Sequence, residues 1–194
     1  MLTGREFVER LLRTGLGSPD TIIGCTGDEV RRLEKTVGLN LPERYKDFLR
    51  AAGKCAGAYD VDGDWLYPEL LTLKEKAVKL LNLMENGKLS LPEKAFVCAM
   101  GTPEGFAFFE TGDPLETGPI FSYYEEDGHF TRGYDSFWEM LEKELPTAED
   151  LQRTDSPGMS GRHERARRRV RKFKSLWFRV IDYLDSYAKS LPRN

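Results

Sequence analysis

Hydrophobic residues recur every three or four positions in four stretches of the first 90 residues, with polar residues between them. This spacing places the apolar side chains on one face of an amphipathic helix. The four predicted helices run from about residue 4 to 15, from Thr26 to Gly38, from Pro42 to Gly53, and from Thr72 to near Gly87. Three of them open with a Thr and a Glu three residues later, which is the capping-box pattern. We expect Val30, Leu33, Tyr45 and Phe48 to point into a shared core.

The middle of the chain changes to short apolar runs bounded by turn residues, which favours β-strands. These runs are residues 95–100, 105–110, 119–124 and 129–134. Because the segments between them are short enough for hairpins, we predict an antiparallel meander. A fifth helix is predicted from Ser136 and Glu139 to Pro146, and the Gly- and Asp-rich residues 54–68 are predicted to form a loop or an irregular strand pair. The predicted fold class is α+β, with helices packed on a mostly antiparallel sheet.

The C-terminal part has a different pattern. Residues 147–161 lack periodicity and contain Pro and Gly, so we predict a linker after a domain of residues 1–146. Residues 162–191 regain helical spacing, which predicts an amphipathic C-terminal helix. Its first half holds a basic patch: Arg165, Arg167, Arg168, Arg169, Arg171 and Lys172. Docking of this helix onto the rest of the chain is favoured over self-association, and contact with nucleic acid or an anionic membrane is favoured least.

Charge is divided unevenly along the 194 residues, whose net charge is −3. Residues 1–150 hold 17 basic and 28 acidic side chains, whereas residues 151–194 hold 12 basic and 4 acidic ones. The acidic part therefore suits a partner of positive charge. No run approaches the roughly 18 apolar residues of a membrane-spanning helix. The three cysteines are odd in number and far apart, which favours reduced thiols and a cytoplasmic location.

One stretch carries a family resemblance. The stretch reads Val30-x-x-Leu33-Glu34-x-x-Val37-Gly38-Leu39-Asn40-Leu41-Pro42-x-x-Tyr45-x-x-Phe48-Leu49. Together with Asp113-Pro114 and the segment Ser136-Phe137-Trp138-Glu139-x-Leu141, it resembles the SUKH superfamily over about residues 20 to 145. That group includes yeast cell-wall glucan-synthesis regulators and bacterial immunity proteins that neutralise secreted toxins. The resemblance implies an α+β domain with helices on a mostly antiparallel sheet, and it extends to no residue after 160.

Catalytic chemistry is hard to assemble from this sequence. The histidines are His129, in a predicted hairpin, and His163, just after the predicted linker, and we expect both to be solvated. Residues 158–162 depart from the GxSxG pattern of serine hydrolases because Arg162 replaces the final Gly. Cys98 lies within an apolar strand and is expected in the core. We therefore predict that the protein is not an enzyme.

Cofactor binding is also not predicted. The alternating Asp60, Asp62 and Asp64 resemble the start of a calcium loop, but Trp65 and Leu71 stand where an EF-hand needs Gly and Glu. The glycines between residues 101 and 105 lack the ending of a phosphate-binding loop. We expect neither a metal nor a nucleotide.

Surface residues remain as the candidates for function. Acidic side chains adjoin aromatic ones in two segments, a composition that suits contact with a cationic protein. The candidate partner-binding residues are Asp60, Asp62, Asp64, Trp65, Tyr67, Tyr123, Tyr124, Glu125, Glu126 and Asp127. The alternative is that they form two solvated turns and several core aromatics. The leading hypothesis is an immunity protein that masks a cationic toxin domain. The alternative is an intracellular regulatory scaffold related to the cell-wall synthesis regulators.

Overall fold

A computed structural model describes residues 2–60, 64–101 and 105–145, and the predicted linker and C-terminal helix lie outside the described residues. The described part is an α+β fold, as predicted. Its helices are α1 (Gly4–Thr14), α2 (Gly27–Val37), α3 (Glu43–Ala52), α4 (Leu73–Glu85) and α5 (Phe137–Glu144). Short 3-10 turns lie at Gly57–Asp60 and Glu69–Leu71.

The predicted caps are confirmed for the first two helices. Thr3 and Thr26 each accept a hydrogen bond from the backbone N–H of a Glu three residues on, and that Glu binds the N–H of the Thr in return. Helix α4 begins at Leu73, directly after Thr72 as predicted, but the expected capping box is absent. Thr72 has helical backbone angles and caps nothing with its side chain, because the 3-10 turn before it already turns the chain into the helix.

The four predicted strands form one antiparallel sheet in the order β3–β4–β5–β6, so the meander is confirmed. The strands are β3 (Ala95–Met100), β4 (Gly105–Glu110), β5 (Ile120–Tyr124) and β6 (Phe130–Tyr134). A second, two-stranded sheet pairs β1 (Ile22–Ile23) with β2 (Cys55–Ala56). The segment from residue 54 therefore contributes one short strand to a pair with residues 22–23, rather than forming a strand pair of its own.

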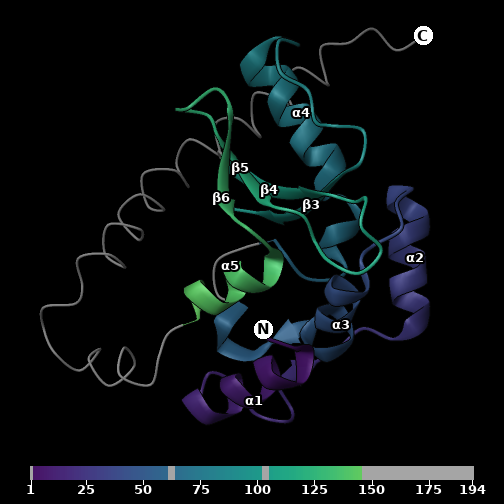
Figure 1. The fold of residues 1–194 in the computed structure, drawn as a ribbon, viewed down its shortest axis with the longest axis vertical. Coiled ribbons are helices and arrows are strands. Elements are labelled where there is room, and N and C mark those ends of the chain that lie inside the picture. Colours follow the sequence, from purple (N-terminus) through teal and green to yellow (C-terminus); the bar gives the residue numbers. More distant parts are fainter. Residues whose placement is uncertain (1, 61–63, 102–104, 146–194) are drawn as a thin grey trace, which may run out of the picture. The chain divides into compact units, whose positions relative to one another are not determined.

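Both faces of the larger sheet carry aromatic side chains. On one face, Phe96 and Phe109 lie 5.1 and 5.2 Å from the ring of Tyr45 on α3. On the other face, Phe106 stacks on Tyr123, whose hydroxyl binds Glu85 of α4. Figure 1 shows α4 on one side of the sheet and α1, α3 and α5 on the other. The described domain therefore has three layers, with the sheet in the middle.

The core forms as the helical spacing predicts. Val30, Leu33, Tyr45 and Phe48 are at most 4% exposed, which confirms that they share an interior. Phe48 also stacks on Trp65, with 5.4 Å between ring centroids. Burial of large aromatic side chains is the main stabilising contribution in such a core.

The loop between β4 and β5 supplies hydrogen-bond acceptors to the first N–H groups of α3 and α5. The carbonyls of Pro114 and Leu115 accept hydrogen bonds from the first N–H groups of α3, at 2.9 and 3.0 Å. These groups have no partner within a helix, and Pro42 offers no side-chain cap. The Thr117 hydroxyl likewise accepts a bond of 2.9 Å from the N–H of Phe137, at the start of α5. The residues that carry the family resemblance here are therefore structural.

Candidate protein-binding surface

The sheet register brings the two predicted acidic segments to the same end of the sheet. Met100, Phe106, Tyr123 and Phe130 lie opposite one another across the four strands. Asp64 continues this row beyond β3, because its N–H and C=O both bind Met100, at 3.1 and 2.8 Å. With about 4.8 Å between neighbouring strands, Asp64 and Tyr123 lie about 14 Å apart. Residues separated by some 60 positions in the sequence therefore lie at the same end of the sheet.

The most exposed part of this surface is the turn between β5 and β6. Glu125, Glu126 and Asp127 are all exposed, and within the described part of the chain none of their side chains has a hydrogen bond or an ion pair. We call these three residues the acidic turn. Tyr124 precedes it with 56% of its side chain exposed. Its carbonyl closes the turn by accepting a hydrogen bond of 3.0 Å from the N–H of Asp127.

Two other carboxylates at this end of the sheet are already engaged. Asp64 forms an ion pair of 2.9 Å with Lys76 of α4. Glu85 accepts a hydrogen bond of 2.7 Å from the hydroxyl of Tyr123. Burial, together with that bond to a carboxylate, raises the pKa of Tyr123 above its ordinary value. Among the described residues at this end of the sheet, the unpaired negative charge therefore lies in the acidic turn.

The predicted aromatic residues separate into buried and exposed ones. Trp65 is 8% exposed and Tyr123 is fully buried, so neither ring is presented to a partner. Tyr67 is half-buried, and its N–H binds the carbonyl of Gly53 at the end of α3. Tyr124 is thus the exposed aromatic residue of the predicted set. The burial of Trp65 and Tyr123 agrees with the core alternative stated above.

Other predicted residues cannot be placed on this surface. Asp62 lies outside the described residues, and Asp60 is the last residue of the first 3-10 turn. The basic patch, Arg165, Arg167, Arg168, Arg169, Arg171 and Lys172, also lies outside the described residues.

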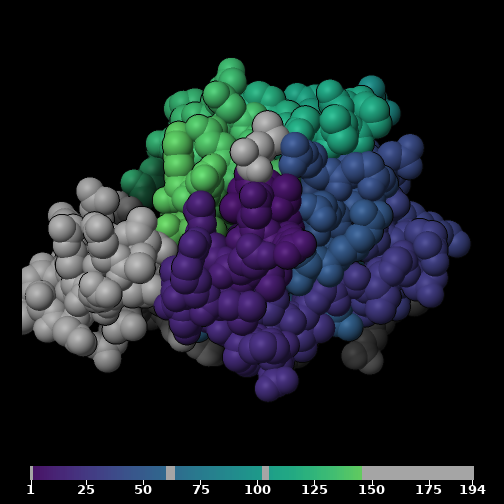
Figure 2. All heavy atoms as spheres, turned by 60° about the horizontal axis from the view of Figure 1, so that its bottom comes forward, coloured from purple at the N-terminus to yellow at the C-terminus, as the bar shows by residue number. Residues whose placement is uncertain are grey.

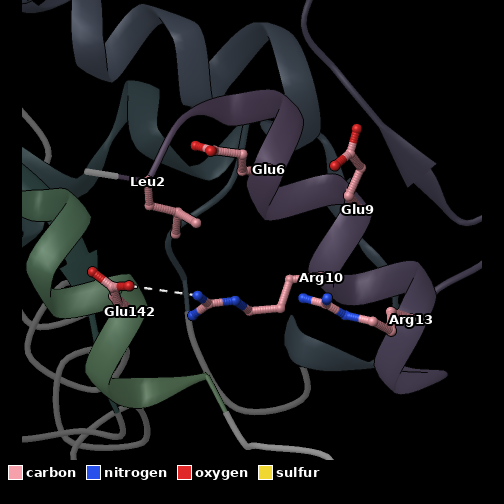
Figure 3. Close-up of a pocket in the computed structure, with 6 residues that line it drawn as sticks. All are labelled: Leu2, Glu6, Glu9, Arg10, Arg13 and Glu142. Carbon is pink, nitrogen blue, oxygen red and sulfur yellow. Dashed lines mark hydrogen bonds and ion pairs between the residues drawn. The ribbon is translucent and has the colours of Figure 1, made fainter.

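A second charged surface, which the sequence analysis did not identify, lies between α1 and α5. Figure 2 shows α1, in purple, side by side with the green C-terminal part of the described chain, where Arg10 lies 3.4 Å from Glu142. Six residues line a depression of about 440 Å³ here: Leu2, Glu6, Glu9, Arg10, Arg13 and Glu142 (Figure 3). The helical spacing of the charges on α1 was visible in the sequence. The contact with α5 was not, because it joins residues 132 positions apart.

Two of the three thiols are shielded by burial. Burial raises the pKa of Cys25 to about 11 and that of Cys98 to about 12, so both thiols stay protonated at neutral pH. His129 is exposed, and its Nδ1 lies 2.6 Å from the carbonyl oxygen of Asp127. In residues 2–60, 64–101 and 105–145, no three His, Cys, Asp or Glu side chains converge as metal ligands would. Within the same ranges, no helix has the length and apolar content that a membrane crossing requires.

Comparison with known proteins supports the resemblance noted in the sequence. A search of curated proteins gave no match. The model of the SMI1 / KNR4 family (SUKH-1) matches residues 24–143, which are more than half of the chain and include α2, α3, α4 and the whole four-stranded sheet. The chain therefore belongs to the SMI1 / KNR4 family (SUKH-1).

Proposed function

We propose that this protein is a non-enzymatic immunity protein that neutralises a bacterial toxin by binding a positively charged domain of it. The observation that carries the proposal is the acidic turn, whose three exposed carboxylates have no partner among the described residues. They adjoin Tyr124, which offers an exposed ring for contact. The mechanism is stoichiometric masking of the toxin in the cytoplasm.

The physical basis is electrostatic complementarity. Unpaired carboxylates at an exposed tip attract a cationic surface and speed association, and this effect weakens as salt screens the charges. A tyrosine next to them adds apolar contact at a low cost in conformational entropy. Carboxylates on the rim of an interface act mainly on the association rate, whereas a buried aromatic ring acts on dissociation.

Co-expression with the toxin tests the proposal. The acidic-turn variant, Glu125→Gln/Glu126→Gln/Asp127→Asn, keeps side-chain size and removes three charges. We expect it to bind the toxin domain encoded by the neighbouring gene about tenfold more weakly, and to protect cells less. Tyr124→Ala should shorten the lifetime of the complex. Wild-type protein that neither binds this toxin domain nor protects cells would contradict the proposal.

A matched control separates local charge from total charge. The remote acidic variant, Asp20→Asn/Glu93→Gln/Glu110→Gln, removes the same three charges from exposed side chains that also lack partners among the described residues. Glu110 lies opposite Ala95, at the end of the sheet away from the acidic turn. We expect this variant to bind and protect nearly as well as the wild type. Equal losses in both variants would show that only net charge matters.

The depression between α1 and α5 favours a second candidate function, a regulatory scaffold that binds two partners at once. It carries charges of both signs and belongs to different elements from the acidic turn. A scaffold whose acidic turn is neutralised would lose the partner bound there and keep the second one. Arg13→Ala would instead remove the second partner, bound at the depression. Affinity capture with the two variants distinguishes a scaffold from an immunity protein, which would lose its single partner only in the acidic-turn variant.

A further inference from the structure

The two edges of the four-stranded sheet differ. At the β3 edge, Ala95 to Cys98 are buried, and Asp64 binds the backbone of Met100 on the outer side. At the β6 edge, Thr131, Arg132 and Gly133 are exposed. Among the strands that the structure describes, β5 is the one neighbour of β6, which forms the edge of the sheet in Figure 1. The outer side of β6 therefore offers backbone hydrogen-bonding groups without a strand partner in the described part.

The β6 edge has only part of the usual protection against pairing with another chain, an irregularity at Gly133. Natural edge strands are blocked by Pro, by Lys side chains or by bulges. Phe130–Tyr134 contains neither Pro nor Lys. Its one charged side chain, Arg132, is held by Asp135 at 2.6 Å. The irregular pairing with β5 is confined to the end next to Tyr134, so the residues from Phe130 to Arg132 present a regular edge.

The charges and side chains around this edge define what fits it. The acidic turn comes just before β6, so a basic segment is attracted to that end. Phe130 lies on the face of the sheet that holds Phe106 and Phe108, whereas Thr131 pairs with Ser122 on the opposite face. Successive side chains of an added strand would point to these two faces in turn. An apolar residue beside Phe130 would suit the first face, and basic residues in the segment would suit the acidic turn.

We infer that β6 takes up an extended segment of the partner, with alternating apolar and basic residues, as a fifth strand of the sheet. The inference rests on the proposed function, since it describes how a cationic partner engages the acidic turn. The main chain of the segment supplies affinity, as in other strand-addition complexes, and the alternating side chains supply selectivity.

A peptide pair tests this inference on the full chain. The probe is a capped six-residue peptide of alternating Val and Lys, and the control has the same sequence with N-methyl groups on all its amides. The control keeps the charge but cannot pair as a strand. We expect the probe to slow hydrogen exchange of the amides in residues 130–134 several-fold. We also expect calorimetry to show binding at least tenfold weaker for the methylated peptide and for the acidic-turn variant, but not for the remote acidic variant.

The outcomes separate this inference from the proposed function. Equal binding of both peptides would overturn strand addition while leaving a charge-based contact at the acidic turn in place. Protection of residues 130–134 before any peptide is added would overturn it too, since the edge would already be covered. If this slowed exchange without peptide depended on protein concentration, the group covering the edge would be a second copy of the chain. The acidic-turn variant could protect cells less from the toxin while the probe peptide leaves hydrogen exchange at β6 of the wild type unchanged. That result would keep the proposed function and contradict the fifth strand.

Discussion

At the scale of single residues, Tyr45 is unusual because its hydroxyl is buried and has no hydrogen-bond partner among the described residues. Burial raises the pKa of this hydroxyl well above its ordinary value. Its ring lies 4.7 Å from that of Phe137, in the centre of the core. The ring therefore stabilises the fold, whereas the hydroxyl is a buried polar group without compensation.

Tyr45→Phe should consequently leave the free energy of unfolding unchanged or raise it by up to about 1 kcal/mol. Tyr123→Phe is the matched comparison, because it removes a hydroxyl that does have a partner, Glu85. That change should lower stability by about 1 kcal/mol. Urea unfolding of the two variants measures both effects. A loss of more than about 1 kcal/mol in Tyr45→Phe would show that its hydroxyl has a partner after all.

The three cysteines should differ in reactivity. Cys25 and Cys98 are buried, and burial raises their pKa values, whereas Cys55 is half-exposed. The thiolate is the reactive form of cysteine. An aromatic disulfide reagent at pH 8 should therefore label Cys55 rapidly, and Cys25 and Cys98 only on unfolding. Cys55→Ser should abolish the rapid phase. Rapid labelling of that variant would contradict the buried positions of the other two thiols.

At the scale of elements, the sequence predicted best what depends on neighbours along the chain. The capping boxes at Thr3 and Thr26 and the left-handed Gly38 after α2 need only residues within one helical turn. The start of α3 was also predicted, at Pro42, but the partners of its first N–H groups were not. Its N–H groups bind the carbonyls of Pro114 and Leu115, some 70 residues away. Local patterns carry no information about such partners.

The start of α5 gives a test of these distant caps. Thr117→Val keeps the shape of a side chain that is 4% exposed but leaves the N–H of Phe137 without its acceptor. We expect stability to fall by about 1–3 kcal/mol, the cost of a buried unpaired donor. Thr111→Val is the control, because the carbonyl of Lys94 keeps its bond to the Thr111 N–H. Equal losses in the two variants would contradict the role given to Thr117.

At the scale of the whole molecule, the sequence predicted which residue types form the candidate surface but not how they are arranged in space. The sequence identified the acidic segments, but their meeting at one end of the sheet follows from strand register, which places Asp64 in one row with Tyr123. Burial of Tyr123 was one of two alternatives that the sequence left open. Since both faces of this sheet are covered with aromatic rings, alternation along β5 does not separate buried from exposed positions.

Stability of the molecule should fall below about pH 5. Hydrogen bonds to the carboxylates lower the pKa values of Glu6, Glu29 and Asp113, through Thr3, the Thr26 N–H and the Leu115 N–H respectively. The pKa values of these carboxylates are lower in the folded state than in the unfolded state. Their contribution to the free energy of unfolding is therefore present above the unfolded pKa values and is lost as pH falls through the folded ones. Urea midpoints at pH 7, 5, 4 and 3 should show this, and Glu29→Gln should flatten the decline.

Stability should also fall above about pH 9, for the opposite reason. Burial raises the pKa of Cys25 from 9.0 to about 11 and that of Cys98 from 9.0 to about 12. Because the folded pKa values lie above the unfolded ones, each thiol contributes to the free energy of unfolding below pH 9. This contribution is lost as pH rises from 9 toward the folded pKa values, by about 1 kcal/mol per pH unit for each thiol. Cys25→Ala/Cys98→Ala should be less stable than the wild type at pH 7 but lose less stability between pH 9 and 10.5. A decline as steep in this variant would mean that the thiols are not the groups that titrate. Tyr134 would then be the next candidate, because its hydrogen bond to Glu144 raises its pKa to about 12.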